Sequence, residues 1–394
     1  MSERKMSTLG SRIRQELEVL SKRSELRTLD LPGGINLCSN DYLGLAGHLR
    51  LKLALIDAVA RAERVGGTGS RLLSGNHRVW EKLEAEFADF AGTSAALYFG
   101  SGYAANVGLL SAILKPGDTV FSDSLNHASL IDGIRLSRAN RYIYPHGDVD
   151  ALERGLREMR AASGAKVIVT ESVFSMEGDI APLDKLVQLA RDYGAELMVD
   201  EAHATGVWGP QGRGIVAERG YESQVLAVVH TCGKALASAG GFVCSSRDLK
   251  DYLLNRSRTF IYSTALPPYF AGQIHEALEL ARRANSERDR LSTVAGALRE
   301  SFAATKIDCG RSMTQIVPIV LGSNEAALHV AARLEESGFA VRAIRPPTVP
   351  EGTARLRLSL TSAISLEEIR RLVGVVVKEV RYLKQPQSTT GAYA

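Results

Sequence analysis

Residues 225–234 read Val-Leu-Ala-Val-Val-His-Thr-Cys-Gly-Lys, an apolar run that ends in a polar turn carrying a lysine. An apolar run of this length, bounded by a turn, is typical of a buried strand. Further apolar runs lie along the middle of the chain, at 95–99, 119–121, 166–170, 197–199 and 241–244. Helical patterns such as residues 182–193 separate several of these runs. The alternation predicts an α/β domain built on a mostly parallel sheet.

The segments that flank this region predict the domain organisation. Residues 11–29 have apolar positions at helical spacing, and Leu31-Pro32-Gly33-Gly34 then stops a helix. We therefore expect an N-terminal arm at 1–45 and a large α/β domain at 46–285. A charged helix at 276–301 then leads to short strands and two more helices. This order predicts a smaller C-terminal α+β domain at 286–394.

The composition argues against several classes of protein. Lys and Arg (48) nearly balance Asp and Glu (44) without a basic block, so nucleic-acid binding is not expected. No apolar stretch is long enough to span a membrane, and the N-terminus has no apolar signal core. The four cysteines form no Cys-x-x-Cys pair, so we expect neither a disulfide framework nor a metal site. Together these features predict a cytoplasmic protein.

A glycine turn follows the first of the predicted strands. Ligands bind beyond the carboxyl ends of strands in open α/β sheets. After residues 95–99 comes Gly100-Ser101-Gly102-Tyr103, which opens a predicted helix. Free N–H groups and the positive end of the helix dipole make such a turn suitable for a phosphate. Taken alone, a plain tight turn explains it better, because the Gly-x-Gly pattern is common.

Two more strands end in residues that suit chemistry. Asp200-Glu201-Ala202-His203 follows the run at 197–199, and Lys234 follows the run at 225–229. A sheltered lysine can form a Schiff base, because desolvation makes its neutral amine accessible. The alternatives are a solvated strand end and an ordinary surface lysine. The three features together match pyridoxal 5'-phosphate, which has a phosphate, a ring nitrogen that an aspartate keeps protonated, and an aldehyde that a lysine traps.

Longer motifs resemble a known group, the fold-type I pyridoxal-phosphate transferases and, within them, the α-oxoamine synthase family. These motifs lie at 39–45, 69–75, 126–129, 171–179, 200–203, 231–234 and 262–268. The resemblance spans roughly residues 10–380. It implies a large domain with a mostly parallel sheet, a smaller α+β C-terminal domain and a homodimer with shared active sites.

The resemblance also implies roles for individual residues. Lys234, His127 and Asp200 would be catalytic, with His127 stacked on the cofactor ring. The implied cofactor-binding residues are Gly102, Tyr103, His127, Ser175, Asp200, His203, Thr231 and Lys234, with Ser263 and Thr264 reaching the phosphate in the neighbouring subunit. The implied substrate-binding residues are Arg27, Asn40, His127, Arg345, Thr348 and Arg357.

Within the family, residues 344–350 and 355–358 resemble members that condense L-alanine with a pimeloyl thioester in biotin biosynthesis. The implied products are 8-amino-7-oxononanoate, carbon dioxide and the free thiol. Lys234 would then also be the general base that removes the α-proton of alanine. The acyl carrier is coenzyme A or an acyl-carrier protein, and the sequence leaves both open.

Other interpretations stay open at this point. Sister enzymes of the family join glycine with acetyl-CoA or succinyl-CoA, or serine with a palmitoyl thioester. An aminotransferase would share Lys234 and Asp200, and a regulator could bind the cofactor without turnover. Arg23 is an alternative to Arg27, and Cys232 fits a small buried filler. Arg355 and Arg357 alternate with leucines, so they lie on one side of a strand that can face solvent.

Overall fold

The computed structural model describes residues 8–385 and divides into two compact units. Unit 2 contains Asn40–Ser292 and Thr361–Ala363, and unit 1 contains the described residues up to Ser39, Thr293–Leu360 and the described residues from Ile364 onward. The boundary near Ser292 falls inside α12 (Asn285–Thr305). The predicted arm and domains, with limits at residues 45 and 285, stay a prediction.

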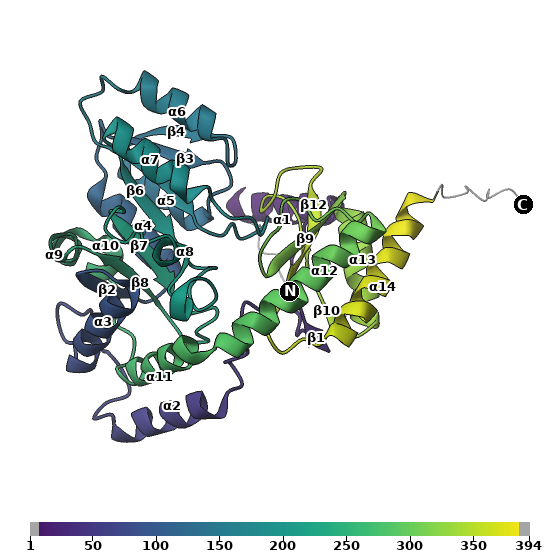
Figure 1. The fold of residues 1–394 in the computed structure, drawn as a ribbon, viewed down its shortest axis with the longest axis horizontal. Coiled ribbons are helices and arrows are strands. Elements are labelled where there is room, and N and C mark those ends of the chain that lie inside the picture. The colour runs from purple at the N-terminus through teal and green to yellow at the C-terminus, as the bar shows by residue number, and fades with distance from the viewer. Residues whose placement is uncertain (1–7, 386–394) are drawn as a thin grey trace, which may run out of the picture. The chain divides into compact units, whose positions relative to one another are not determined.

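Unit 2 is built on a seven-stranded sheet with the order β2-β8-β7-β6-β5-β3-β4 (Figure 1). Its strands are β2 (Ala95–Phe99), β3 (Thr119–Asp123), β4 (Asn140–Tyr144), β5 (Lys166–Glu171), β6 (Glu196–Asp200), β7 (Ala227–Thr231) and β8 (Gly241–Ser245). Only β8 is antiparallel to its neighbours, and it lies between β2 and β7. The remaining neighbouring strands pair in parallel. The carboxyl ends of β2, β3, β4, β5, β6 and β7 therefore lie at one edge of the sheet.

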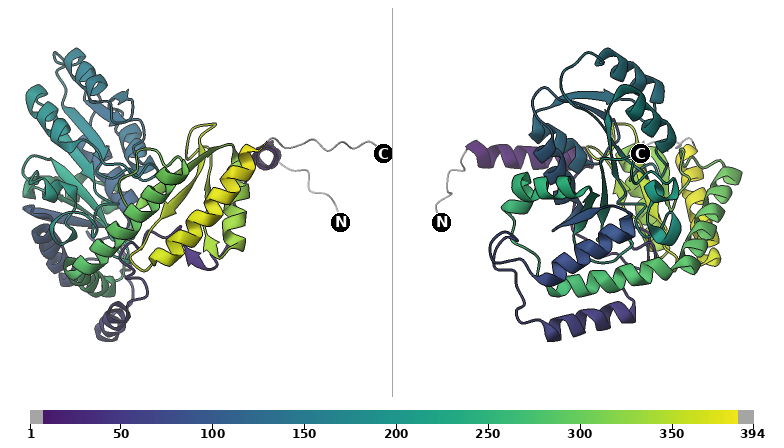
Figure 2. Two further views of the ribbon diagram at one scale, coloured as in Figure 1. Left: turned by 45° about the vertical axis from the view of Figure 1, so that its right-hand side comes forward. Right: turned by 60° about the vertical axis from the view of Figure 1, so that its left-hand side comes forward.

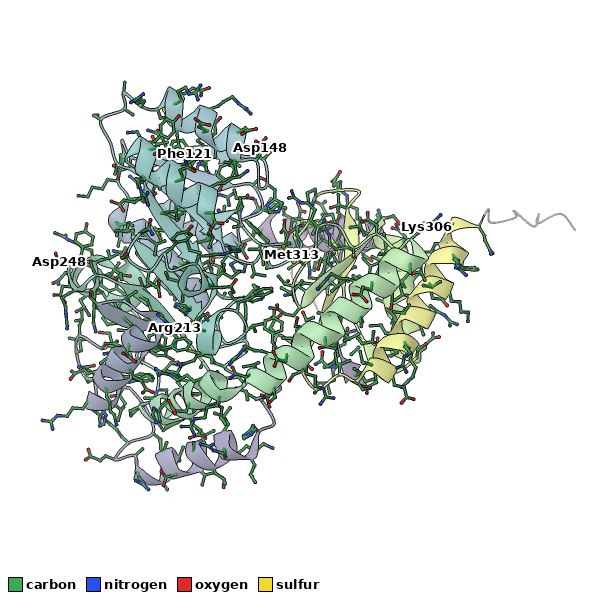
Figure 3. The ribbon with its side chains drawn as sticks, viewed as in Figure 1. Phe121, Asp148, Arg213, Asp248, Lys306 and Met313 are labelled. Carbon is green, nitrogen blue, oxygen red and sulfur yellow. The ribbon has the colours of Figure 1, made fainter. Side chains whose placement is uncertain are left out.

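Helices cover both faces of this sheet (Figure 1). The helices of unit 2 are α2 (Leu49–Arg61), α3 (Arg78–Ala91), α4 (Gly102–Ile113), α5 (Ala128–Ser137), α6 (Val149–Glu158), α7 (Leu183–Tyr193), η1 (Pro210–Gly212), α8 (Ile215–Glu218), α9 (Arg247–Arg256), α10 (Arg258–Ile261) and α11 (Tyr269–Arg283). Every residue of β2, β3, β7 and β8 is buried, as expected for strands covered on both sides. Phe121 of β3, labelled in Figure 3, is one of these fully buried side chains.

The helix predicted at 276–301 is divided in the structure. The chain leaves helical geometry at Ala284, where ψ is 42°, so α11 ends there and α12 begins at Asn285. The helix α11 packs beside α2, which is distant in sequence, and the pair is visible in two orientations (Figure 2). The break therefore allows α11 to stay with unit 2 while α12 continues into unit 1.

Unit 1 contains two small sheets and several helices. The strands β11 (Ala343–Ile344), β12 (Ala354–Ser359) and β9 (Ile316–Gly322) form an antiparallel sheet. A parallel pair joins β1 (Ile35–Asn36) to β10 (Phe339–Ala340), so the N-terminal segment is hydrogen-bonded into this unit. The remaining elements are α1 (Thr8–Lys22), α13 (Asn324–Glu336) and α14 (Leu366–Lys384), of which α13 and α14 pack together.

Within residues 8–385, no helix is long and apolar enough to cross a membrane. The same range contains no group of three or more His, Cys, Asp and Glu side chains that could hold a metal ion.

Candidate active site

The carboxyl ends of five parallel strands bring the predicted cofactor residues of unit 2 to one edge of the sheet. Ligands bind at this edge in α/β folds. A cavity of about 120 Å³ lies there. Its lining consists of Gly102, Tyr103, Asn106, His127, Ser129, Glu171, Asp200, Ala202, Val229, Thr231 and Lys234. Six of the eight residues predicted to bind the cofactor within one subunit thus line a single cavity.

The glycine turn after β2 forms one end of this cavity. The Ser101 hydroxyl accepts a hydrogen bond from the Ala104 N–H at 3.0 Å and so begins α4. The N–H groups of Gly102 and Tyr103 come first in the helix and have no intrahelical acceptor. A Cβ at Gly102 would lie 3.2 Å from Oγ1 of Thr231, so the turn approaches β7 closely. Two N–H groups without an intrahelical acceptor and a hydroxyl at a helix N-terminus form a suitable site for a phosphate.

Asp200 ends β6 and is 5% exposed. Its Oδ1 accepts a hydrogen bond from the Ala202 N–H at 2.7 Å. Its Oδ2 accepts one from Nδ2 of Asn106 at 2.6 Å. Each carboxylate oxygen has further acceptor capacity, so Asp200 can also hold a protonated ring nitrogen in the cavity.

His127 follows β3 and caps α5, where its Nδ1 accepts from the Ser129 N–H at 3.2 Å. The same Nδ1 lies 2.7 Å from the Ser129 hydroxyl. Part of the residue is exposed to solvent, while its ring lies among other groups of the cavity. Burial of the ring lowers the pKa of His127, the carboxylate of Asp200 opposes that shift, and the nearby Lys234 adds to it. A neutral ring is therefore favoured at this position.

Lys234 belongs to a chain of hydrogen bonds. Its Nζ lies 2.6 Å from Nε2 of His203, and Nδ1 of His203 lies 2.6 Å from the Tyr42 hydroxyl. The Tyr42 hydroxyl donates to Oδ1 of Asn40 at 3.1 Å. The Tyr42 hydroxyl uses its own proton for Asn40, so it accepts the hydrogen bond from His203. Nδ1 of His203 therefore carries the hydrogen, and Nε2 accepts from the Lys234 amine. The chain thus fixes both the tautomer of His203 and the position of the Lys234 amine.

These groups fit pyridoxal phosphate. The glycine turn suits its phosphate, Asp200 suits its ring nitrogen, and Lys234 lies in the same cavity for its aldehyde. Two buried oxygens of cavity residues, Oδ1 of Asn106 and Oε1 of Glu171, have no hydrogen-bond partner within the protein. Buried polar atoms without partners are uncommon and point to a ligand or water.

The other predicted cofactor residues lie outside the cavity lining. Ser175 is buried, and its N–H donates to Oε2 of Glu171 at 3.2 Å. His203 is buried and contacts the cavity through Lys234. Ser263 and Thr264 are exposed, and Thr264 forms a bridge to Ser70. Their predicted contact with a neighbouring subunit stays a prediction.

Three of the predicted substrate residues lie together in unit 1. Nη2 of Arg27 donates to Oγ1 of Thr348 at 3.3 Å and to the Pro346 carbonyl at 3.3 Å. Arg345 donates to the Ser24 carbonyl. Burial and, next, the positive Arg27 lower the pKa of Arg345. Arg27 and Arg345 both line a cavity of about 840 Å³, and Arg23 does not.

The remaining substrate residues lie in different units. Asn40 belongs to unit 2 and Arg357 to unit 1. Arg355 and Arg357 are each only 8% exposed. The interpretation from the sequence that their side of β12 can face solvent is therefore wrong. Arg357 donates to the Ser359 hydroxyl at 2.7 Å. A guanidinium suits a carboxylate ligand, because it can donate two parallel hydrogen bonds to it.

Known proteins resemble the chain along most of its length. A sequence model of the family described as aminotransferase class I and II matches residues 32–376. The chain belongs to that family. The 8-amino-7-oxononanoate synthase of Burkholderia mallei (strain SAVP1) is 47% identical over 361 residues, which is 90% of this chain and 90% of that protein. The resemblance predicted from the sequence motifs is confirmed by this relative.

Solved structures of the family also match. A structure of 8-amino-7-oxononanoate synthase from Francisella tularensis is 31% identical, with a TM-score of 0.77, and covers 89% of this chain and 98% of that chain. A structure described as SPT with PLP internal aldimine is 29% identical, with a TM-score of 0.87, and covers 97% and 99%. The predicted α/β fold of the fold-type I transferases is confirmed by these matches. The family is dependent on pyridoxal phosphate.

Several polar residues of this family member were not assigned a role from the sequence. They are Tyr42, Asn106, Ser129 and Glu171. Asn106 had the clearest signal in the sequence, because it is the one amide among residues 102–113, where every other residue except Tyr103 is apolar or small. Burial of Glu171, and next the charge of Asp200, raise the pKa of its carboxyl well above the usual range. A neutral Glu171 would add no negative charge beside Asp200.

Glu201 has a structural position despite its place beside Asp200. Its Oε1 accepts from the Ile215 and Val216 N–H groups, both at 2.9 Å, and so caps α8. Burial raises the pKa of Glu201 to about 8. Within the motif 200–203, Asp200 therefore lines the cavity, whereas Glu201 supports α8.

His146 connects the two loops that carry His127 and Ser175. Its Nδ1 lies 3.0 Å from Oδ1 of Asp123, and its Nε2 lies 2.9 Å from Oδ2 of Asp179. Burial of the ring opposes protonation, but the hydrogen bonds to the two carboxylates outweigh it and raise the pKa of His146 to about 9. The imidazolium therefore stabilises both loops at neutral pH.

Replacing His146 by alanine is expected to lower the free energy of unfolding by about 1.5–3 kcal/mol at pH 6. The folded-state pKa is raised, so the stabilisation is complete below the ordinary pKa of roughly 6.5 and is lost as pH rises through about 9. Urea unfolding of wild type and His146→Ala at pH 6 and pH 9.5 measures this difference. His275→Ala, which removes a half-exposed pair with Glu86, is the control and should change stability by less than about 1 kcal/mol. An equal loss of unfolding free energy at both pH values would contradict a stabilising role for the charged His146 ring.

Proposed function

We propose that the chain condenses L-alanine with a pimeloyl thioester, with loss of carbon dioxide, to give 8-amino-7-oxononanoate and the free thiol. This is a step in making biotin. The observation that carries the proposal is the cavity in which a phosphate turn, Asp200 and Lys234 meet. The relatives named 8-amino-7-oxononanoate synthase support the choice of substrates.

The cavity residues would hold pyridoxal phosphate, which supplies an electron sink that stabilises a carbanion at the α-carbon of the amino acid. The N–H groups of Gly102 and Tyr103 and the Thr231 hydroxyl would bind the phosphate. Asp200 would keep the ring nitrogen protonated, His203 would bind the ring hydroxyl, and Ser175 would also contact the cofactor. His127 would stack on the ring.

Lys234 would have two tasks. It would attach the cofactor covalently, and its free amine would then take the α-proton of alanine. The contact with Nε2 of His203 supports the second task, because it fixes the position of the amine. That geometry matters because a general base must lie within hydrogen-bond reach of the proton that it removes.

Arginine side chains would select the two substrates. Arg27 and Arg345 give the unit 1 cavity two positive charges, which suit the free carboxylate of a pimeloyl chain. Thr348, hydrogen-bonded to Arg27, would contact the same substrate. Asn40 and Arg357 would bind the carboxylate of alanine.

A cytoplasmic homodimer with shared active sites is part of the proposal. Leu49, Leu53 and Ile56 lie on one face of α2 and are 67%, 53% and 65% exposed. Contiguous exposed apolar side chains usually mark an interface. Ser263 and Thr264 would reach the phosphate in the partner subunit. Full activity at a concentration where the protein is monomeric would contradict this part.

Release of free thiol from pimeloyl-CoA tests the function directly. With L-alanine, thiol and carbon dioxide should appear in equal amounts, and glycine or serine should react at least about tenfold more slowly. Acetyl-, succinyl- and palmitoyl-CoA serve as alternative acyl donors for comparison with pimeloyl-CoA. The rate with pimeloyl acyl-carrier protein shows which of the two acyl carriers the protein uses better. Faster thiol release with glycine and acetyl- or succinyl-CoA, or with serine and palmitoyl-CoA, would indicate a sister enzyme. Amino transfer to a keto acid without thiol release would indicate an aminotransferase.

A further inference from the structure

Asn106 is a buried amide in α4, and the other buried residues of this helix are apolar or glycine. It is 2% exposed and lies one turn after the Gly102 turn of α4. Burying an amide is unfavourable unless its hydrogen bonds are formed. Its partners therefore indicate why the helix contains an asparagine there.

The two N–H bonds of the Asn106 amide point to two different residues. Nδ2 lies 2.6 Å from Oδ2 of Asp200 and 2.9 Å from Oγ of Ser129. A carboxylate oxygen can only accept, so the amide atom beside Asp200 is the nitrogen. Oδ1 of Asn106 has no partner in the protein, and the residue lines the cavity.

The hydrogen bonds continue from Ser129 to His127. The Ser129 oxygen accepts from Asn106, so its own proton is available to Nδ1 of His127, 2.7 Å away. Ser129 is fully buried, which leaves its hydroxyl few other partners. An Nδ1 that accepts this proton defines the neutral ring with hydrogen on Nε2.

We propose that Asn106 is a positioning residue that orients Asp200 directly and His127 through Ser129, and so sets two sides of the cofactor site at once. The inference rests on the proposed cofactor. A neutral donor such as an amide suits this place, because it orders the carboxylate of Asp200 without adding a charge that would compete with the ring nitrogen. The relay also couples the two residues, so that a change at one end alters the other.

Titratable groups from neighbouring elements surround Asp200. Glu171 on β5, Glu201 beside it and His127 before α5 interact with it electrostatically. Lys234 after β7 lines the same cavity. Asn106 is the neutral side chain on α4 that bonds to this cluster. Replacing it by an acid would add a further negative group 2.6 Å from Asp200, and two carboxylates that close share a proton.

Cofactor binding, measured without substrate, tests the inference. In Asn106→Leu the new side chain has a similar volume but forms no hydrogen bonds. This variant should raise the Kd for pyridoxal phosphate by roughly 10- to 100-fold at all pH values. Asn106→Asp should bind nearly as wild type at low pH, where the shared proton replaces the amide donor, and lose affinity as pH rises. In both variants, the absorbance of the bound cofactor should change with pH around a midpoint that differs from the wild-type midpoint. Ser129→Ala should shift the titration with a smaller loss of affinity.

Leu110→Ala is the control, because it removes a fully buried apolar side chain of the same helix and none of these hydrogen bonds. It should destabilise the protein and leave the spectral titration unchanged. Wild-type affinity and titration in Asn106→Leu would overturn the inference. If that variant does not fold, a pH-independent affinity in Asn106→Asp overturns it equally. A wild type that binds the cofactor but makes no product from alanine and pimeloyl-CoA would refute the proposed function alone.

Discussion

Replacing Lys234 by alanine is expected to abolish covalent attachment of pyridoxal phosphate and to lower the rate of product formation by at least about 10²- to 10⁴-fold. The variant loses both the amine that traps the aldehyde and the base that lies beside His203. Mass spectrometry after borohydride reduction measures the attachment, because only a covalently bound cofactor adds to the mass. Thiol release from pimeloyl-CoA with alanine measures the rate.

The same substitution should leave the fold intact. Lys234 is half-buried, and its removal breaks the hydrogen bond to His203, a loss of about 0.5–1.5 kcal/mol. Lys185→Ala, which removes an exposed lysine of α7, is the matched control and should change neither readout. A small primary amine added to Lys234→Ala should restore part of the rate but not the covalent attachment, which separates the base from the anchor. A reduced wild type without added mass, or a variant with wild-type rate, would refute the assignment.

The strand ends were predictable because their signals are local. A buried run followed by a polar turn marks a strand end within about ten residues, and parallel strands then bring Asp200 and Lys234 to the same edge. The alternation of Arg355 and Arg357 with leucines likewise predicted a strand, which is β12. Burial of that strand on both sides was not predictable, since the covering elements are set by tertiary packing.

The partners of the site residues could not be predicted, because they depend on long-range contacts. Asn106 and Asp200 are 94 positions apart in the chain, and Tyr42 and His203 are 161 apart. The hydrogen bonds between them depend on how α4 packs on the sheet and on the path of the segment before α2. No local periodicity encodes a contact between residues so far apart in the chain, so the hydrogen bonds that fix Asp200 and Lys234 were visible only in the structure.

Glu84→Ala is expected to lower the free energy of unfolding by about 3–5 kcal/mol, as the loss of one partner from a buried ion pair does. Glu84 of α3 is 2% exposed and accepts from three directions. Its oxygens lie 2.6 Å from Nη1 of Arg71, 2.8 Å from Nζ of Lys250 and 3.1 Å from the Tyr98 nitrogen. The side chains of Arg71 and Lys250 are only 10% and 15% exposed, so alanine would leave two poorly solvated cations and an unpaired N–H.

Urea unfolding followed by circular dichroism measures the change, with Glu84→Gln as a variant that keeps the shape and loses the charge. Asp57→Ala is the control, because Asp57 and Arg61 form an exposed pair on α2 that should contribute less than about 1 kcal/mol. The decisive variant combines Glu84→Ala with Lys250→Ala. Because the second substitution removes one of the unpaired cations, the double variant should lose less stability than the sum of the two single ones. Strict additivity would mean that Glu84 and Lys250 do not interact energetically, and a loss below about 1 kcal/mol for Glu84→Ala would contradict the network as a whole.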